Sequence, residues 1–224
     1  MKLTLRFAIG VACMLGYAGI SAAQQRNINF ELLQAVRGGS EAGVRALLDE
    51  GANPNSRNRL GDTPLNTAAR AGQLALANLL IERGADVNLA NLARVTPLMS
   101  AVFGGHVEIV KLLVAHKADP NPVARVRKTA MVYAAGSGHT ECVRVLLDAG
   151  VGVNTRYANE VTALMWAAAE GHVDTAKLLL ARGADVTARD DRGMSALALA
   201  VAEKKSAAID VLRDLLRGDD ESVQ

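Results

Sequence analysis

Apolar and small residues recur along this chain at a fixed spacing of 33 residues. One copy, residues 63–69, reads Thr-Pro-Leu-Asn-Thr-Ala-Ala. Each later copy keeps an initial Thr or Ser followed by an apolar, Ala-rich stretch. These copies begin at Thr96, Thr129, Thr162 and Ser195, and one step back from residue 63 falls on Phe30. A short unit cannot bury its own apolar face, so the period predicts six stacked units, starting near residues 30, 63, 96, 129, 162 and 195.

Each unit predicts two short helices. Proline after the first Thr suits the first turn of a helix, where a missing N–H costs nothing. Glycine at a constant phase predicts the end of this helix, because glycine tolerates the left-handed backbone that closes a helix. A second helix follows, with paired leucines such as Leu146-Leu147. The first helices are expected to end at Gly72, Gly105, Gly138 and Gly171, and the second ones at Gly51, Gly84, Gly150 and Gly183.

Several fixed offsets together resemble the ankyrin-repeat family. They are the 33-residue period, the Thr-Pro-Leu starts, a Gly-His step before the second helix, and endings such as Gly-Ala-Asp-Val-Asn at residues 84–88. The resemblance spans residues 29–216. It implies an all-α solenoid of six stacked helix–turn–helix units joined by short hairpin turns, which we assign to residues 24–217.

The chain departs from the family pattern in two ways. The His that usually follows Thr-Pro-Leu is absent from every unit. The hairpin glycine is present at Gly61 and Gly193, but Arg94, Arg127 and Glu160 replace it in the middle units. We therefore expect the three middle turns to be less regular.

The two end units differ from the others as the caps of a solenoid should. The last unit has Glu-Lys-Lys at residues 203–205 in place of the Gly-His step, and residues 218–224 are expected to form a frayed acidic tail. Polar outer faces prevent further units from stacking. The polar residues of the first cap are Glu31, Gln34, Arg37 and Glu41.

Residues 1–23 have the three parts of a secretory signal peptide. Lys2 and Arg6 lie near the start, an apolar stretch covers residues 7–20, and small residues follow at 21–23. We expect cleavage after Ala23 and export to the periplasm. The alternatives are a retained membrane anchor, for which the apolar stretch is short, and a lipoprotein modified at Cys13, which lacks a Leu three residues before the cysteine.

Removal of this segment would leave a chain with no net charge. The 25 basic residues would lose Lys2 and Arg6, so 23 would face 23 acidic residues. No net field then attracts nucleic acid or an anionic membrane, and we expect neither as a partner. Only Cys142 would survive processing, so no disulfide could form within the chain. We expect a monomer.

The residues with catalytic or metal-binding potential fit structural roles better. His106, His139 and His172 are one repeat apart, so they lie on units about 8–10 Å apart, whereas one metal ion needs its ligands within about 2.1 Å. We expect each His to cap a second helix. Cys142 takes the place of Ile109 and is expected in the core. There is no phosphate loop, nucleophile elbow or HExxH motif, so we expect no enzyme activity, cofactor or metal.

The family resemblance implies that the hairpin turns and the exposed ends of the first helices bind a partner protein. The turn at residues 123–128 combines three cations with two valines and no acid, a mixture enriched in interface cores. A solvated loop is the alternative interpretation. Tyr133 and Trp166 are expected in the core instead. The predicted partner-binding residues are Arg59, Leu60, Arg70, Leu92, Phe103, Arg125, Val126, Lys128, Tyr157 and Asn159.

Together these observations predict a periplasmic protein-interaction module with a scaffold, accessory or immunity role. One alternative is a secreted effector that binds a foreign target protein. A weak enzyme using Cys142 and His139, and a spacer without a partner, are two others.

Overall fold

A computed structural model describes residues 22–221 of the chain. The predicted signal peptide therefore lies outside the described residues except at positions 22 and 23, and residues 222–224 also lie outside them. The described part is all-α and consists of six successive helix pairs, as the repeat predicts. The first helices are α2 (Ala22–Arg37), α4 (Pro64–Arg70), α6 (Pro97–Phe103), α8 (Ala130–Gly136), α10 (Ala163–Glu170) and α12 (Ala196–Ala202).

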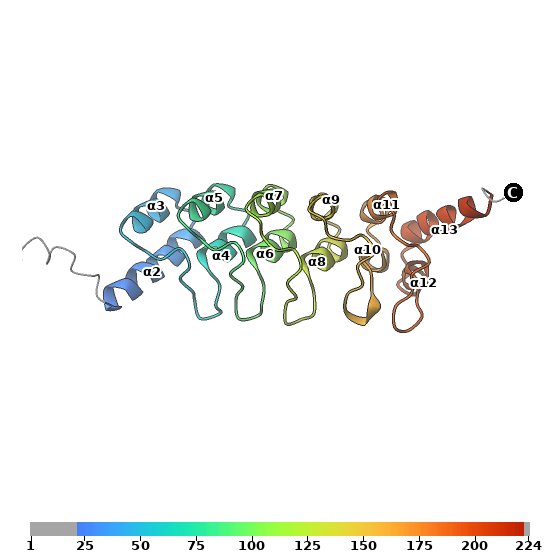
Figure 1. Cartoon of the computed structure of the whole chain (residues 1–224), viewed down its shortest axis with the longest axis horizontal. Helices are drawn as coiled ribbons and strands as arrows, with labels where there is room; N and C mark the ends of the chain where they lie inside the picture. The colour runs from blue at the N-terminus through green and yellow to red at the C-terminus, as the bar shows by residue number, and fades with distance from the viewer. Residues whose placement is uncertain (1–21, 222–224) are drawn as a thin grey trace, which may run out of the picture.

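The second helices are α3 (Glu41–Asp49), α5 (Leu74–Glu82), α7 (Val107–Ala115), α9 (Thr140–Asp148), α11 (Val173–Ala181) and α13 (Ser206–Glu221). They form one row, and the first helices form a second row beneath them (Figure 1). The hairpin turns project from the side away from the second helices. Helix α13 continues to its end at Glu221, so residues 218–221, which were predicted to belong to a frayed tail, are helical.

Each first helix after α2 begins at a hydroxyl side chain. The side-chain oxygen of Thr63, Thr96, Thr129, Thr162 or Ser195 accepts the backbone N–H of the residue three positions on, at 3.0 to 3.4 Å. This bond satisfies an N–H that the helix itself leaves without a partner. Asn66 adds the reciprocal bond in α4, because its Oδ1 accepts the backbone N–H of Thr63 at 3.2 Å.

The core lies between the two helix rows and is built from small and medium-sized side chains. Alanine occupies one equivalent position in the first helices, where the small side chain lets neighbouring helices approach closely. Leucine fills an equivalent position in the second helices. The fully buried alanines are Ala68, Ala101, Ala134, Ala167 and Ala200, and the fully buried leucines are Leu80, Leu113, Leu146, Leu179 and Leu212.

The hairpin turns are more regular than the sequence led us to expect. Arg94 and Arg127 both have φ 60°, close to the φ of 77° at Gly61 and Gly193. Each of these four residues donates its N–H to the carbonyl three positions earlier, at 2.8 to 3.0 Å. The prediction of irregular turns was therefore wrong for these two arginines, because the turn imposes the left-handed conformation on a residue that is not glycine.

The fourth hairpin is the one that differs. Both Asn159 and Glu160 adopt positive φ, at 62° and 61°, and residues 158–160 form a short 3-10 helix, η1 (Ala158–Glu160). The N–H of Glu160 still donates to the carbonyl of Tyr157, at 3.0 Å. The expected irregularity is therefore confined to this turn among the three that lack glycine.

Gly61 and Gly193 occupy equivalent hairpin positions, so substituting each by alanine separates the cost of a steric clash from the cost of backbone strain. A Cβ added at Gly61 would lie 2.8 Å from the backbone nitrogen of Leu92, whereas one added at Gly193 would meet no atom within 4 Å. We expect Gly193→Ala to lower the free energy of unfolding by about 1–2 kcal/mol, which is the cost of the left-handed backbone alone. Gly61→Ala should cost clearly more, because the second hairpin must also move. Urea unfolding of both variants checks this, and equal losses would contradict it.

Hydrogen bonds tie neighbouring hairpins and loops together along the solenoid. At the hairpin tips, Leu92 N–H donates to the carbonyl of Leu60 at 3.1 Å and Arg125 N–H to that of Ala93 at 2.9 Å, and Asp191 N–H donates to that of Asn159 at 3.1 Å. At the loops that follow the second helices, an asparagine Oδ1 accepts an aspartate N–H of the next unit. These loop pairs are Asn55 with Asp86, Asn88 with Asp119, and Asn154 with Asp185, at 2.7 to 2.8 Å.

The junction between the third and fourth units lacks both kinds of tie in the described structure. Val126 and Ala158 would be the hairpin pair, and Asn121 and Gly152 would be the loop pair. Neither pair is hydrogen-bonded, and Asn121 Nδ2 instead donates to Asp119 of its own loop at 3.1 Å. Gly152 occupies the position that is aspartate in the neighbouring units. The solenoid is therefore less constrained on its loop side at its centre.

Candidate interaction surface

The hairpin tips present large apolar side chains to solvent in the first three hairpins. Leu60 is 66% exposed, Leu92 is 58% exposed and Val126 is 65% exposed. Phe103, at the end of α6, is 60% exposed. Their predicted exposure is thus confirmed. Arg59, Arg125 and Asn159 are also exposed, and Lys128 is partly exposed. We call the exposed hairpin tips together with the ends of α4 and α6 the hairpin face.

Asparagine and aspartate side chains hold three of the five hairpins in shape. In each, Oδ1 accepts two backbone N–H groups of the same turn, at 2.8 to 3.0 Å. Ala124 and Tyr157 occupy this position in the third and fourth hairpins. Sequence reasoning missed this feature, although the recurrence of the bracing residues at the repeat phase is a usable signal. They are Asn58, Asn91 and Asp190.

Arg70 has a structural partner on the hairpin face. Its Nη2 lies 3.3 Å from Oδ1 of Asp62, a carboxylate that is only 5% exposed. Asn91 Nδ2 also donates to this oxygen, at 2.7 Å. Asp62 therefore connects α4 with two successive hairpins, and the charge of Arg70 is in part neutralised. The other predicted cations of the face have no ion pair within the described residues.

Three aromatic rings and one lysine form a cluster beside the third hairpin. Phe103 contacts Tyr133 edge-on, with ring centroids 5.8 Å apart. Lys128 Nζ lies 4.7 Å from the centroid of Trp166 and 5.8 Å from that of Tyr133, within the range of a cation–π interaction. Tyr133 and Trp166 were predicted to be core residues. Both do pack against the core, but they are only partly buried, and they lie under the ammonium group of Lys128.

Tyr157 is less accessible than the other predicted partner-binding residues, and its role in binding stays a prediction. Its ring is partly buried against the core, and its hydroxyl is fully buried. This burial raises the pKa of Tyr157 to about 12. The residue occupies the position that holds a bracing Asn or Asp in three other hairpins, and its buried hydroxyl is not accessible to solvent.

The histidine row is structural, but its bonds differ from the predicted caps. His106, His139 and His172 stand at the N-cap positions of α7, α9 and α11, yet their side chains make no capping bond. Each ring instead donates an Nε2–H to a carbonyl of the preceding unit. The acceptors are Arg70 at 3.1 Å, Phe103 at 3.3 Å and Gly136 at 3.1 Å. The imidazoles therefore connect successive units and do not stabilise the start of their own helices.

Cys142 lies in the core of α9, as predicted from its repeat position. The side chain is fully buried, and burial raises the pKa of its thiol to about 11. A thiol that remains protonated at neutral pH is a poor nucleophile. His139 is also committed to the carbonyl of Phe103. This arrangement gives no support to a nucleophilic role for Cys142. In the described part of the chain, no group of three or more His, Cys, Asp or Glu residues is placed to hold a metal ion.

Asp190 supplies a pH dependence that can be measured. Burial would raise the pKa of this carboxyl, but the N–H of Met194 and the Arg192 guanidinium, which lies 2.7 Å away, together lower it. A lowered folded-state pKa stabilises the fold above the unfolded value of about 3.9, and this stability is lost as the pH falls through the folded-state pKa. We expect Asp190→Asn to weaken the loss of stability between neutral pH and pH 3. Urea midpoints at both pH values, with the exposed Asp191→Asn as control, check this; an unchanged pH dependence would contradict it.

Charge is distributed unevenly over the five hairpins. The first three carry six cations, and their one acid, Asp62, is buried and paired. The last two mix both signs and have no large exposed hydrophobic residue among their tips. The cations are Arg57, Arg59, Arg94, Arg125, Arg127 and Lys128. The apolar and cationic parts of the hairpin face therefore coincide in the N-terminal half of the solenoid.

A sequence model described as ankyrin repeats (three copies) matches this chain over residues 32–124, 121–190 and 157–223. The chain belongs to the ankyrin-repeat family. Ankyrin repeats suggest protein–protein interaction and are typically non-catalytic modules. A comparison with curated proteins gave no match to this ankyrin-repeat chain. None of the helices described is both long and apolar enough to cross a membrane.

Proposed function

We propose that this ankyrin-repeat protein is an exported, periplasmic binding module that holds a partner protein against its hairpin face. The observation that carries the proposal is the exposure of Leu60, Leu92 and Val126 at three successive hairpin tips. Each tip also carries or adjoins an arginine without an ion pair in the described structure. Water-exposed apolar groups gathered on one face are typical of interaction sites, and arginine and aromatic residues are enriched in the centres of interfaces.

The scaffold suits this role because the side chains are held in place before a partner arrives. Tip-to-tip hydrogen bonds and the Asn58 and Asn91 braces fix the first two hairpins. Phe103 is supported from one side by Tyr133. A preorganised surface loses less conformational entropy on binding. The proposed location rests on the signal-peptide pattern of residues 1–23. The proposed scaffold, accessory or immunity role rests on the proposed binding of a partner.

The test is capture of a partner from a periplasmic extract of the producing cell, with brief crosslinking. Wild type is compared with the double variant Arg125→Glu, Lys128→Glu. The control is Lys177→Glu, Arg213→Glu, which reverses the same number of charges on α11 and α13. We expect wild type and control to capture the same protein and the hairpin variant to lose most of it, since reversed charges repel a partner matched to cations.

The outcomes separate binding from location. Failure of wild type to enrich any protein after crosslinking would contradict the binding role. Equal capture by the hairpin variant would move the site away from the third hairpin. Cell fractionation provides the other test, because accumulation of the chain in the culture medium would contradict a periplasmic site of action.

A further inference from the structure

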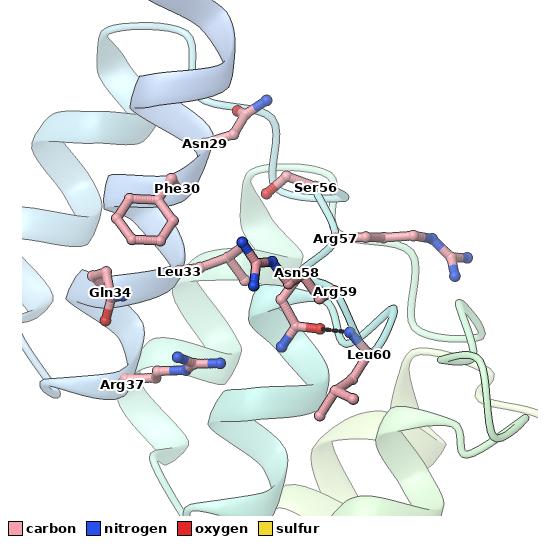
Figure 2. A pocket seen from close by; sticks show the side chains of 10 residues that line it. All are labelled: Asn29, Phe30, Leu33, Gln34, Arg37, Ser56, Arg57, Asn58, Arg59 and Leu60. Atoms are coloured by element: carbon pink, nitrogen blue, oxygen red, sulfur yellow. Dashed lines mark hydrogen bonds between the residues drawn. The ribbon is translucent and has the colours of Figure 1, made fainter.

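We infer that the bound segment of the partner is an acidic peptide that inserts an apolar side chain into the hollow between α2 and the first hairpin. This inference rests on the proposed function and specifies the chemistry of the partner. The hollow has a volume of about 510 Å³. Phe30, Leu33 and Leu60 provide its apolar surface, and Figure 2 shows them facing the space between helix and hairpin.

The hollow arises because the first unit lies at the N-terminal end of the solenoid and differs from the later units. In the five later units the position of Phe30 is a Thr or Ser that starts the first helix. Helix α2 begins earlier, at Ala22, so Phe30 lies within the helix and its side chain is 59% exposed. No capping bond requires a small polar residue at this position, and an aromatic ring is displayed there instead. An exposed phenylalanine beside an exposed leucine is costly in water unless a partner covers both.

Cations surround the apolar surface of the hollow. Figure 2 shows the guanidinium groups of Arg37 and Arg59 directed across the space, whereas Arg57 is directed away from it. Arg57 donates to the carbonyl of Ala90 at 3.0 Å. The hollow is lined by no Asp or Glu, and neither Arg37 nor Arg59 has an ion pair among the described residues. Their charges are therefore available to an acidic ligand.

A polar group at the hollow also lacks a protein partner. Ser56 Oγ is buried and makes no hydrogen bond in the described structure. A buried hydroxyl without a partner is unfavourable, and a carboxylate or backbone amide of a ligand would satisfy it. The hollow thus combines an apolar floor, two free guanidinium groups and an unused hydroxyl.

The same chemistry continues along the hairpin face. A second hollow, of about 330 Å³, shares Leu60 with the first and extends past Leu92 to Arg125. Its one acid, Asp62, is already occupied by Arg70 and Asn91. Towards the C-terminal end the charge changes, because Glu170 and Glu203 line the hollow near Trp166, and its one cation, Arg192, is paired with Asp190. An acidic segment is therefore attracted to the first three units and repelled from the last ones.

A peptide fits these observations better than a nucleic acid does. The cations alternate with aliphatic side chains at Leu60, Leu92 and Val126, which side chains of a peptide can cover but phosphates cannot. A nucleic-acid strand would instead need stacking platforms for successive bases. Among the described residues, Phe30 and Phe103 are the exposed aromatic rings of large area, and they lie in different units.

The experiment selects binders from a displayed library of random peptides of about 12 residues on the full chain. Enriched peptides are synthesised, and their affinity is measured by fluorescence anisotropy at low and high salt. We expect enrichment of Asp and Glu together with at least one Leu, Phe, Tyr or Trp. Arg37→Glu, Arg59→Glu should weaken binding about tenfold or more, whereas Lys177→Glu, Arg213→Glu should leave it unchanged. Phe30→Ser should also weaken binding of these peptides. Circular dichroism establishes that each variant is folded.

Several results would overturn the inference. One is enrichment of neutral or basic peptides, and another is acidic peptides that bind the Arg37, Arg59 variant as tightly as wild type. A single-stranded DNA of about 20 nucleotides that displaces the selected peptides with higher affinity would show that the ligand is a nucleic acid and not a peptide.

The capture experiment distinguishes failure of this inference from failure of the proposed function. If the periplasmic partner is captured equally by the Arg37, Arg59 variant, this inference fails while the proposed function stands. If no partner is captured by wild type, the proposed function itself fails.

Discussion

Leu146→Ala is expected to lower the free energy of unfolding by about 2–5 kcal/mol. Leu146 is fully buried on α9, which packs against α7 on one side and α11 on the other. Truncation removes apolar burial and leaves a cavity that close-packed helices refill only in part. Urea unfolding followed by circular dichroism measures the loss. Leu147→Ala is the matched control, because its side chain is only partly buried and should cost less.

Because Leu146 lies in a central unit, its substitution should also change the shape of the urea unfolding transition. Solenoid units stabilise one another through nearest-neighbour contacts, so a weak central unit can separate the unfolding of the two halves. Trp166 is the one tryptophan of the chain and reports from α10, whereas circular dichroism reports from all helices. We expect the two signals to coincide in wild type and to separate in Leu146→Ala. A loss below that of Leu147→Ala would contradict the assignment of Leu146 to the core.

Phe103→Ala is expected to weaken partner binding by about 2 kcal/mol or more, equal to about 30-fold in Kd. The ring is 60% exposed, lies at the end of α6 and rests edge-on against Tyr133. A large, supported aromatic residue near the centre of an interface is the typical energetic hot spot. Isothermal titration with the captured partner measures the change in affinity.

Stability data provide the control for this second prediction. Loss of the Phe103–Tyr133 contact should cost only about 0.5–1.5 kcal/mol of folding free energy. Leu74→Ala removes a hydrophobic side chain of comparable exposure, 42%, from α5 in the row of second helices. That variant should bind the partner normally. Equal affinity of wild type and Phe103→Ala would remove Phe103 from the proposed site.

The helix pairs could be predicted from the sequence because each has a local physical cause. Thr96, which Pro97 and Leu98 follow, caps the start of α6. Gly105 follows the end of this helix with a φ of 70°, which glycine tolerates without strain. The conformation of Arg94 could not be predicted in the same way. The hydrogen bonds of its own turn hold it there, because its N–H donates to the carbonyl of Asn91. A positive φ is unusual for a residue other than glycine, so the residue type at position 94 gave no signal for it.

The candidate site was predicted in part. The exposure of Leu60, Leu92 and Val126 follows from their phase in the repeat. The burial of Tyr157 was not predicted, because its repeat position holds a bracing Asn or Asp in three other hairpins and a partly buried ring here. Phe30 and Arg37 were recognised only as parts of the end cap. Their contribution to a hollow depends on where α2 begins, which the repeat pattern does not specify.

Because the hairpin and loop hydrogen bonds are missing between the third and fourth units, we expect the solenoid to bend more easily at this junction than at the others. The first helices remain packed across this junction, because α6 contacts α8 and Ala101 and Ala134 on these helices are fully buried. Bending at this junction changes the separation of Val126 and Ala158 without breaking a hairpin-to-hairpin or loop-to-loop hydrogen bond. The bond from His139 Nε2 to the carbonyl of Phe103 still joins the two units. The curvature of the hairpin face can therefore adjust to partners of different shape at one place and at low energetic cost, while the first three units keep their own geometry.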